Sequence, residues 1–252
     1  MAQAYGKKFA KVYNMLWTNF SQSVAPILLQ FYKTHGPQNN YILDLCCGTG
    51  QLAKYFLIQG YHVIGIDLSD AMLTYARENC REYIELGKAK FVKADAKEFT
   101  VEEKVGLVVS TYDAMNHLEN IEALKSCFRS VHKTLVHSGY FIFDLNTLLG
   151  LKTGWNSLTF IDRENIVILN RAIYDEEKNL AVTKITGFIQ EENGLFDRFD
   201  EVVYNKGYVL NDIKHLLLQE GFQEVYFAKI TDLDKVLEEP EMENRVFVVA
   251  RK

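Results

Sequence analysis

Residues 41–50 read Tyr41-Ile42-Leu43-Asp44-Leu45-Cys46-Cys47-Gly48-Thr49-Gly50, an apolar run that ends in a glycine turn. Residues 51–59 then carry apolar side chains at helix-compatible spacing and stop at Gly60. This stretch predicts a buried strand, a tight turn and a helix. Such a unit is the building block of a sheet whose strands are connected through helices.

The same unit recurs downstream. Residues 61–67 predict a second buried strand, and Ser69 is a plausible N-cap for a helix that runs to about Leu86, where Gly87 can end it. Further strands are predicted over 90–94, 105–111 and 140–145, with a helix over 121–135. The alternation indicates an α/β fold with a doubly wound, mostly parallel sheet covered by helices on both faces.

The pattern changes between about residues 158 and 209. Longer strand-like runs appear there, with turn signals at 175–179 and at Asn193-Gly194, which predict an antiparallel β insertion. A helix over 211–220 and strands over 225–230 and 245–250 complete a sheet of seven strands that ends in a β-hairpin. We therefore assign residues 1–150 and 210–252 to the core, with a helical cover near residues 8–32, and residues 151–209 to the insertion.

The composition is that of a globular protein that handles small molecules. The chain has 252 residues, is 48% hydrophobic, and carries a net charge of -5, which gives no broad positive field for nucleic acid. Its four cysteines lack CxxC spacing, so we predict reduced thiols and no metal site. No signal peptide or membrane-length apolar run stands out, which predicts a cytoplasmic protein without a membrane partner.

Acidic residues and glycines fall at the carboxyl ends of the predicted strands, where a doubly wound sheet binds its ligand. Gly48 and Gly50 remove β-carbons where a ligand can approach the backbone, and Asp44 lies just before them as an acceptor for an ammonium group. Asp67 is placed to accept both hydroxyls of a ribose, and Asp95 can accept from an adenine amine. Together these positions fit an adenosine joined to an amino acid.

Three segments, ILDLCCGTG (42–50), VIGIDLS (63–69) and KADAKEF (93–99), resemble the first three motifs of class I methyltransferases that use S-adenosylmethionine (SAM). The resemblance implies a Rossmann-like methyltransferase fold, SAM as cofactor and S-adenosylhomocysteine (SAH) as product. The chain departs from the family at Cys46, where glycine is frequent, and at Gly106, where an acid is common. The implied cofactor contacts are Asp44, Cys46, Gly48, Gly50, Asp67, Leu68, Met72, Asp95, Ala96 and Ser110.

Several alternatives stay open at this point. A glycine turn alone can be a turn without any ligand. A dinucleotide site would need G-x-G-x-x-G, of which residues 46–53 supply only two glycines. A SAM-binding protein without turnover, and a methyltransferase that acts on protein or RNA, are also compatible with the motifs.

The segment 110–117 follows the fourth strand and opens toward the position of the transferred methyl group. It lacks the Asn-Pro-Pro-Tyr type of motif and resembles the loop of small-molecule methyltransferases, including sugar N-methyltransferases, where a histidine matching His117 borders the acceptor. The resemblance makes His117 a candidate base and Tyr13 a candidate cover over the methyl group. Helix capping for His117 and core packing for Trp17 are the competing interpretations.

The insertion offers Trp155, Tyr204 and Tyr208 as residues that line the acceptor pocket, and Arg198 as a further candidate. Aromatic residues of a small sheet also form its own core, and an arginine between two aspartates is also a surface ion-pair partner. No residue pattern identifies the acceptor or predicts the oligomeric state.

Overall fold

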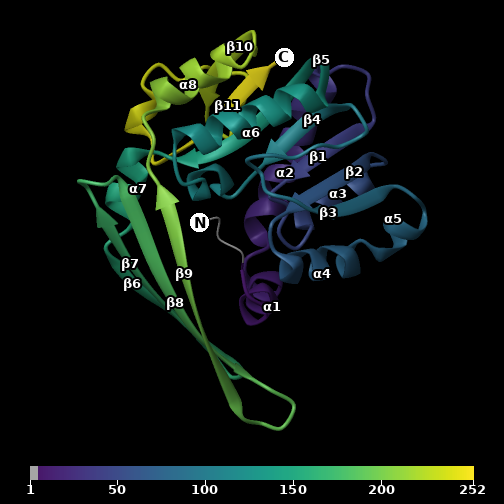
Figure 1. The fold of residues 1–252 in the computed structure, drawn as a ribbon. Helices are drawn as coiled ribbons and strands as arrows, with labels where there is room; N and C mark the ends of the chain where they lie inside the picture. Colours follow the sequence, from purple (N-terminus) through teal and green to yellow (C-terminus); the bar gives the residue numbers. More distant parts are fainter. Residues whose placement is uncertain (1–4) are drawn as a thin grey trace.

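The computed structural model describes residues 5–252 and contains a seven-stranded sheet with the order β10-β11-β5-β4-β1-β2-β3 (Figure 1). Strands β1 to β5 pair in parallel, whereas β11 is antiparallel to both β5 and β10. This confirms the predicted doubly wound, mostly parallel sheet and its terminal hairpin. The strands are β1 (Tyr41–Leu45), β2 (His62–Asp67), β3 (Ala89–Lys93), β4 (Val105–Ser110), β5 (Leu135–Asn146), β10 (Glu224–Ala228) and β11 (Arg245–Arg251).

Helices cover both faces of this sheet, because alternate residues of the buried strands point to opposite sides. Leu43 of β1 belongs to the apolar cluster that includes Phe128 of α6, and its neighbour Ile42 belongs to the cluster that includes Phe56 of α3. The helices of the core are α2 (Asn19–His35), α3 (Gln51–Ile58), α4 (Asp70–Asn79), α5 (Arg81–Glu85), α6 (Ile121–Thr134), α7 (Leu148–Gly154) and α8 (Leu210–Gln219), with two short 3-10 turns, η1 (Ala114–His117) and η2 (Pro240–Met242).

The helix after β2 differs from its prediction. Ser69 is its N-cap, as expected, with Oγ accepting the Met72 N–H at 3.2 Å, but the helix ends at Asn79 and a separate short helix follows. The backbone leaves the helical region at Cys80, and the Asn79 side chain donates to the carbonyl of Thr49 at 2.8 Å. The single helix to Leu86 was therefore a wrong prediction, and the break ties α4 to the glycine turn.

A separate four-stranded antiparallel sheet occupies the predicted insertion, with the order β6-β7-β8-β9. Its strands are β6 (Ser157–Arg163), β7 (Ile166–Asp175), β8 (Leu180–Gln190) and β9 (Phe196–Lys206). Its turns contain Asn179 (φ 47°) and Gly194 (φ 79°), two residue types that tolerate the left-handed conformation. Both predicted turn signals are thus confirmed.

Helix α1 (Lys7–Leu16) packs between the small sheet and the core (Figure 1). Phe9 of α1 and Met72 of α4 share one apolar cluster with Ile168, Ile185 and Val203 of the small sheet. The N-terminal helix and the sheet are therefore held together by burial of apolar surface. None of the helices in the described part of the chain has the length and apolar character needed to cross a membrane.

Candidate functional site

The carboxyl ends of β1, β2 and β4 face the small sheet and α1 across a cavity of about 490 Å³. This volume lies within the range of about 300–1,000 Å³ that is typical of small-molecule sites. Many residues singled out from the sequence line this one cavity: Cys46, Gly48, Asp67, Leu68, Met72, Asp95, Ala96, Tyr13, Trp17, His117 and Trp155. Residues from distant parts of the chain are thus brought together at the sheet edge where a ligand was expected.

Three of the expected cofactor residues do not line the cavity. Asp44 is almost fully buried, and its Oδ2 accepts the Ala53 N–H at 3.1 Å, which ties the start of α3 to β1. Burial raises the pKa of Asp44 to about 8. Gly50 has φ 77°, and a β-carbon there would lie 3.1 Å from Cα of Ala76, so glycine is needed for packing. The Ser110 hydroxyl donates to the carbonyl of Leu45 at 2.7 Å.

Tyr204 and Tyr208, which were predicted to contact the acceptor, do not line the cavity either. Val203 and Asn205 of β9 do line it, and strand alternation therefore turns Tyr204 to the opposite face of the small sheet. Tyr208 is buried, and its hydroxyl donates to the carbonyl of Leu118. Arg198 forms an ion pair with Asp200 at 3.0 Å, as the competing interpretation expected.

Asp67, the last residue of β2, holds the glycine turn that follows β1. Its Oδ2 accepts the Gly48 N–H at 2.9 Å and its Oδ1 accepts the Ser69 N–H at 2.8 Å. Burial raises the pKa of Asp67, although these N–H donors and the nearby His117 act in the opposite direction. Because an ionised carboxylate has about four lone-pair sites, two bonds to backbone leave further sites for ligand hydroxyls.

Gly48 leaves space directly beside this carboxylate. Its φ is 53°, and the nearest atom to an added β-carbon would be Cε1 of Tyr13 at 3.7 Å. A side chain at position 48 would therefore project into the gap between the turn and Tyr13. This open cradle beside Asp67 fits the adenosine and amino-acid parts of SAM.

Cys46 is a non-glycine residue in the left-handed conformation, with φ 61°. The thiol lines the cavity, and burial raises its pKa well above the usual value. The related family often has glycine at this position, and the positive φ gives the physical reason. The chain therefore stores backbone strain at the floor of the cavity.

The strain at position 46 predicts an order of stabilities. Both Cys46→Gly and Cys46→Ala lose the packing of the thiol. Only Cys46→Gly relieves the left-handed strain, because Cys46→Ala keeps the β-carbon. The free energy of unfolding of the glycine variant is expected to exceed that of the alanine variant by about 1 kcal/mol in urea titrations. An alanine variant as stable as the glycine variant would show that position 46 is not strained.

Tyrosine and other aromatic side chains of α1 cover the cavity. Phe9 and Tyr13 of α1, Tyr5 just before it and Trp17 just after it recur every four residues, so they share one side of this segment, and all four line the cavity. Phe9 stacks on Tyr5 with a centroid distance of 4.5 Å, and Tyr112 meets the edge of Tyr13 at 6.1 Å. Tyr5 and Phe9 were not among the predicted site residues, although their spacing alone could have indicated them.

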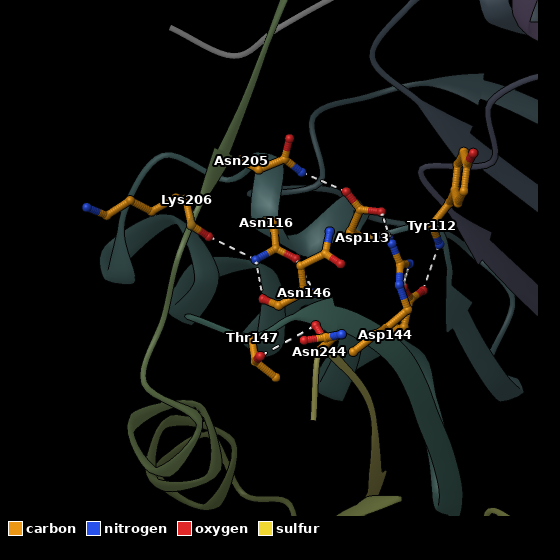
Figure 2. A network of polar contacts seen from close by, with 10 residues as sticks. Tyr112, Asp113, Asn116, Asp144, Asn146, Thr147, Asn205, Lys206 and Asn244 are labelled. Carbon is orange, nitrogen blue, oxygen red and sulfur yellow. Dashed lines mark hydrogen bonds and ion pairs between the residues drawn. The ribbon is translucent and has the colours of Figure 1, made fainter. Parts of the chain in front are cut away.

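A second feature that the sequence analysis missed is a cluster of polar side chains behind the loop after β4. This polar cluster consists of the side chains of Asp113, Asp144 and Asn205 and the backbone N–H of Tyr112 (Figure 2), together with the guanidinium of Arg245. Tyr112 and Asp113 have φ of 69° and 51°, and the buried Asp144 accepts both of their N–H groups, at 2.7 and 2.9 Å. Asp144 thus holds two successive left-handed residues at the edge of the cavity.

Arg245, at the start of β11, joins the two carboxylates of the polar cluster. Its Nη2 donates to Asp113 Oδ1 at 2.7 Å and its Nη1 donates to Asp144. The Asn205 amide donates to the other oxygen of Asp113 at 2.6 Å. Because Asn205 belongs to β9, the cluster connects the small sheet with the core.

The end of β9 is fixed by two further side chains of η1. Asn116 Nδ2 donates to the carbonyls of Lys206 at 2.9 Å and Asn146 at 3.1 Å (Figure 2). His117 Nδ1 lies 2.9 Å from the carbonyl of Tyr204. A carbonyl only accepts, so Nδ1 carries the proton and Nε2 carries the lone pair of the neutral ring.

Comparisons with known proteins agree with this geometry. Residues 42–139 match the family model described as "Methyltransferase domain". The chain is 26% identical to "Putative methyltransferase YqeM" of Bacillus subtilis over 85% of each protein. It is 24% identical to dTDP-3-amino-3,4,6-trideoxy-alpha-D-glucopyranose N,N-dimethyltransferase of Streptomyces venezuelae over 56% of this chain and 58% of that protein.

The fold is shared with solved methyltransferase structures. A SAM-dependent methyltransferase from Clostridium acetobutylicum superposes with a TM-score of 0.80 at 22% identity over 97% of each chain. DesVI from Streptomyces venezuelae superposes with a TM-score of 0.74 at 20% identity over 98% of this chain and 99% of that chain. The fold is therefore that of the Rossmann-like methyltransferases.

The match over residues 42–139, the methyltransferase relatives and the shared fold together support a SAM-dependent methyltransferase. The resemblance stated from the sequence motifs and the prediction of SAM as cofactor are both confirmed.

Proposed function

We propose that the protein transfers a methyl group from SAM to a small molecule that binds between the glycine turn and the small sheet. The observation that carries this proposal is one continuous cavity, which extends from Gly48 and Asp67 to Trp155 and the inner face of the small sheet. Similar folds include sugar N-methyltransferases such as KedS8, with a TM-score of 0.75 at 16% identity. A cavity shared by cofactor and acceptor allows direct transfer between them.

Five residues of the core wall would hold the cofactor. Asp67 accepts the ribose hydroxyls, while Leu68 and Met72 enclose the adenine with Ala96. Asp95 accepts from the adenine amine, and its carboxylate also accepts the Lys97 N–H at 2.9 Å and lies 3.4 Å from Lys97 Nζ. When bound, SAM supplies a methyl group that is activated by the positive sulfur.

The protein contributes alignment and exclusion of water, because methyl transfer is a displacement that needs few catalytic side chains. Tyr13 lies over the gap beside Gly48, and burial raises the pKa of its hydroxyl, so the hydroxyl is protonated at neutral pH. The Tyr13 hydroxyl can therefore donate or accept a hydrogen bond next to the reacting atoms. The aromatic face of α1 and the small sheet together enclose the cavity from the side opposite the core.

His117 is the proposed base. Its Nδ1 is held by the carbonyl of Tyr204, and within the described part of the chain no hydrogen bond engages Nε2. This nitrogen is therefore available to take a proton from a hydroxyl or ammonium acceptor.

A labelled methyl group tests the proposal. With methyl-labelled SAM and a metabolite extract, we expect label to enter the small-molecule fraction, and His117→Asn should reduce the rate about 100-fold because asparagine cannot take the proton. The affinity for SAH should be retained in this variant, since Asp67 and the glycine turn are unchanged. Retained rates would exclude His117 as a base.

The other hypotheses have separate outcomes in the same experiment. SAH binding without any labelled product would indicate a binding protein, and label in the protein or RNA fraction would indicate a macromolecular acceptor. If calorimetry detects no binding of SAM or SAH to the folded protein, the proposed function is wrong.

A further inference from the structure

The wall of the cavity opposite the glycine turn consists mainly of short hydrogen-bonding side chains. Every strand of the small sheet contributes at least one of them: Ser157 and Thr159 from β6, Asn170 from β7, Thr183 from β8 and Asn205 from β9. Because they occupy alternate positions, they share the inner face of the sheet. The flat side chain of Trp155 borders the same region.

The hydrogen bonds within this polar wall leave both donors and an acceptor for a ligand. Trp155 Nε1 donates to Thr183 Oγ1 at 3.0 Å, and Asn170 Nδ2 donates to Thr159 Oγ1 at 3.3 Å. Each threonine hydroxyl therefore accepts one bond from the protein and keeps its own proton to donate. Asn170 Oδ1 is buried and has no partner within residues 5–252. An unpaired buried acceptor is costly, so a ligand donor would be favoured there.

The cations of the cavity are already paired. Arg245 bonds both carboxylates of the polar cluster. Lys97 Nζ lies 3.4 Å from Asp95 and 3.8 Å from Glu119. No other lysine or arginine of the described residues lines the cavity. A phosphate group would therefore find no uncompensated positive side chain, whereas an ammonium group would meet an excess of carboxylates.

Resting on the proposed methyl transfer, we propose that the acceptor is free of phosphate, rich in hydroxyl groups, and neutral or positively charged. Its hydroxyl and amine groups bind Thr159, Asn170 and Thr183, and its flat face contacts Trp155. This acceptor differs from the nucleotide-linked sugar in the name of the Streptomyces venezuelae relative. Selection arises from the wall of the small sheet and from the paired state of Lys97 and Arg245.

Calorimetry with SAH-saturated protein tests this assignment with matched probes: glucose, glucosamine, glucosamine 6-phosphate and dTDP. Glucosamine is expected to bind most tightly, and its 6-phosphate at least about tenfold more weakly, because like charges repel in the acidic cavity. Thr183→Val should weaken glucosamine binding about 3- to 10-fold by removing one hydrogen bond. The matched variant Thr74→Val, exposed on α4, should not.

Three outcomes would overturn the inference. They are binding of glucosamine 6-phosphate or dTDP as tight as that of glucosamine, an unchanged affinity in Thr183→Val, and absence of binding by all three sugars while SAH binds. Failure of SAH itself to bind would instead contradict the proposed methyl transfer.

Discussion

A chain with Arg245→Met is expected to unfold about 3 kcal/mol more easily than the wild type at pH 8, because it leaves buried carboxylates without their cation. Arg245 bonds Asp113 and Asp144, and its guanidinium lies 5.0 Å from the ring centroid of Phe20. Methionine keeps the apolar length of the side chain but not the charge. Urea unfolding followed by circular dichroism measures the loss.

The defect should depend on pH. Burial raises the pKa of Asp144 to about 6, although Arg245 opposes this rise, and removal of the guanidinium raises the pKa further. In the unfolded chain the pKa is about 4. Between about pH 6 and the raised pKa of the variant, Asp144 is therefore protonated in the folded variant and ionised in the unfolded variant. The free energy of unfolding of the variant consequently increases as the pH falls into this range. The difference in free energy of unfolding between wild type and Arg245→Met is expected to become smaller as the pH is lowered from 8 to 6.

Arg129→Met is the matched control. Arg129 likewise donates two hydrogen bonds to carboxylate oxygens, but both go to Glu220, at 3.0 Å, and the arginine lies at an exposed position. Its loss should cost much less and should not vary over this pH range. Equal losses in the two variants, or a gap for Arg245→Met that widens on acidification, would contradict the role given to the polar cluster.

The core fold follows from local sequence patterns, since short apolar runs predict its buried strands and apolar residues at helical spacing predict its long helices. The break at Cys80 was not predictable in this way, because it coincides with a contact between Asn79 and the carbonyl of Thr49, 30 residues earlier. Periodicity describes which face of a helix is buried, and it does not report a side chain that pulls the helix end toward another loop.

Some residues of the candidate site were likewise predictable from the sequence, and others were not. Asp67 and Gly48 were predictable because strand ends converge at one edge of a parallel sheet. The polar cluster was not, because Asp113, Asp144 and Arg245 lie on three elements whose contacts exist only in the folded chain. Tyr204 was assigned to the cavity wrongly because the register of β9 decides which alternate residues face inward, and a shift of one residue reverses that choice.

Asp67→Asn is expected to bind SAH about 100-fold more weakly than the wild type, because the two charge-assisted hydrogen bonds proposed between Asp67 and the ribose are lost or weakened. The fold should be retained. Burial raises the pKa of Asp67, so its ionised form at neutral pH is disfavoured by folding, and asparagine removes that cost while it gives up one of the N–H bonds from Gly48 and Ser69. Asp70→Asn, exposed three residues later and paired with Lys93, is the control and should bind SAH normally. Calorimetry measures the affinity and a thermal melt without ligand measures the fold. We expect the melting temperature to stay nearly constant while the affinity for SAH falls. A folded Asp67→Asn chain that binds SAH like the wild type would show that the cofactor is held elsewhere.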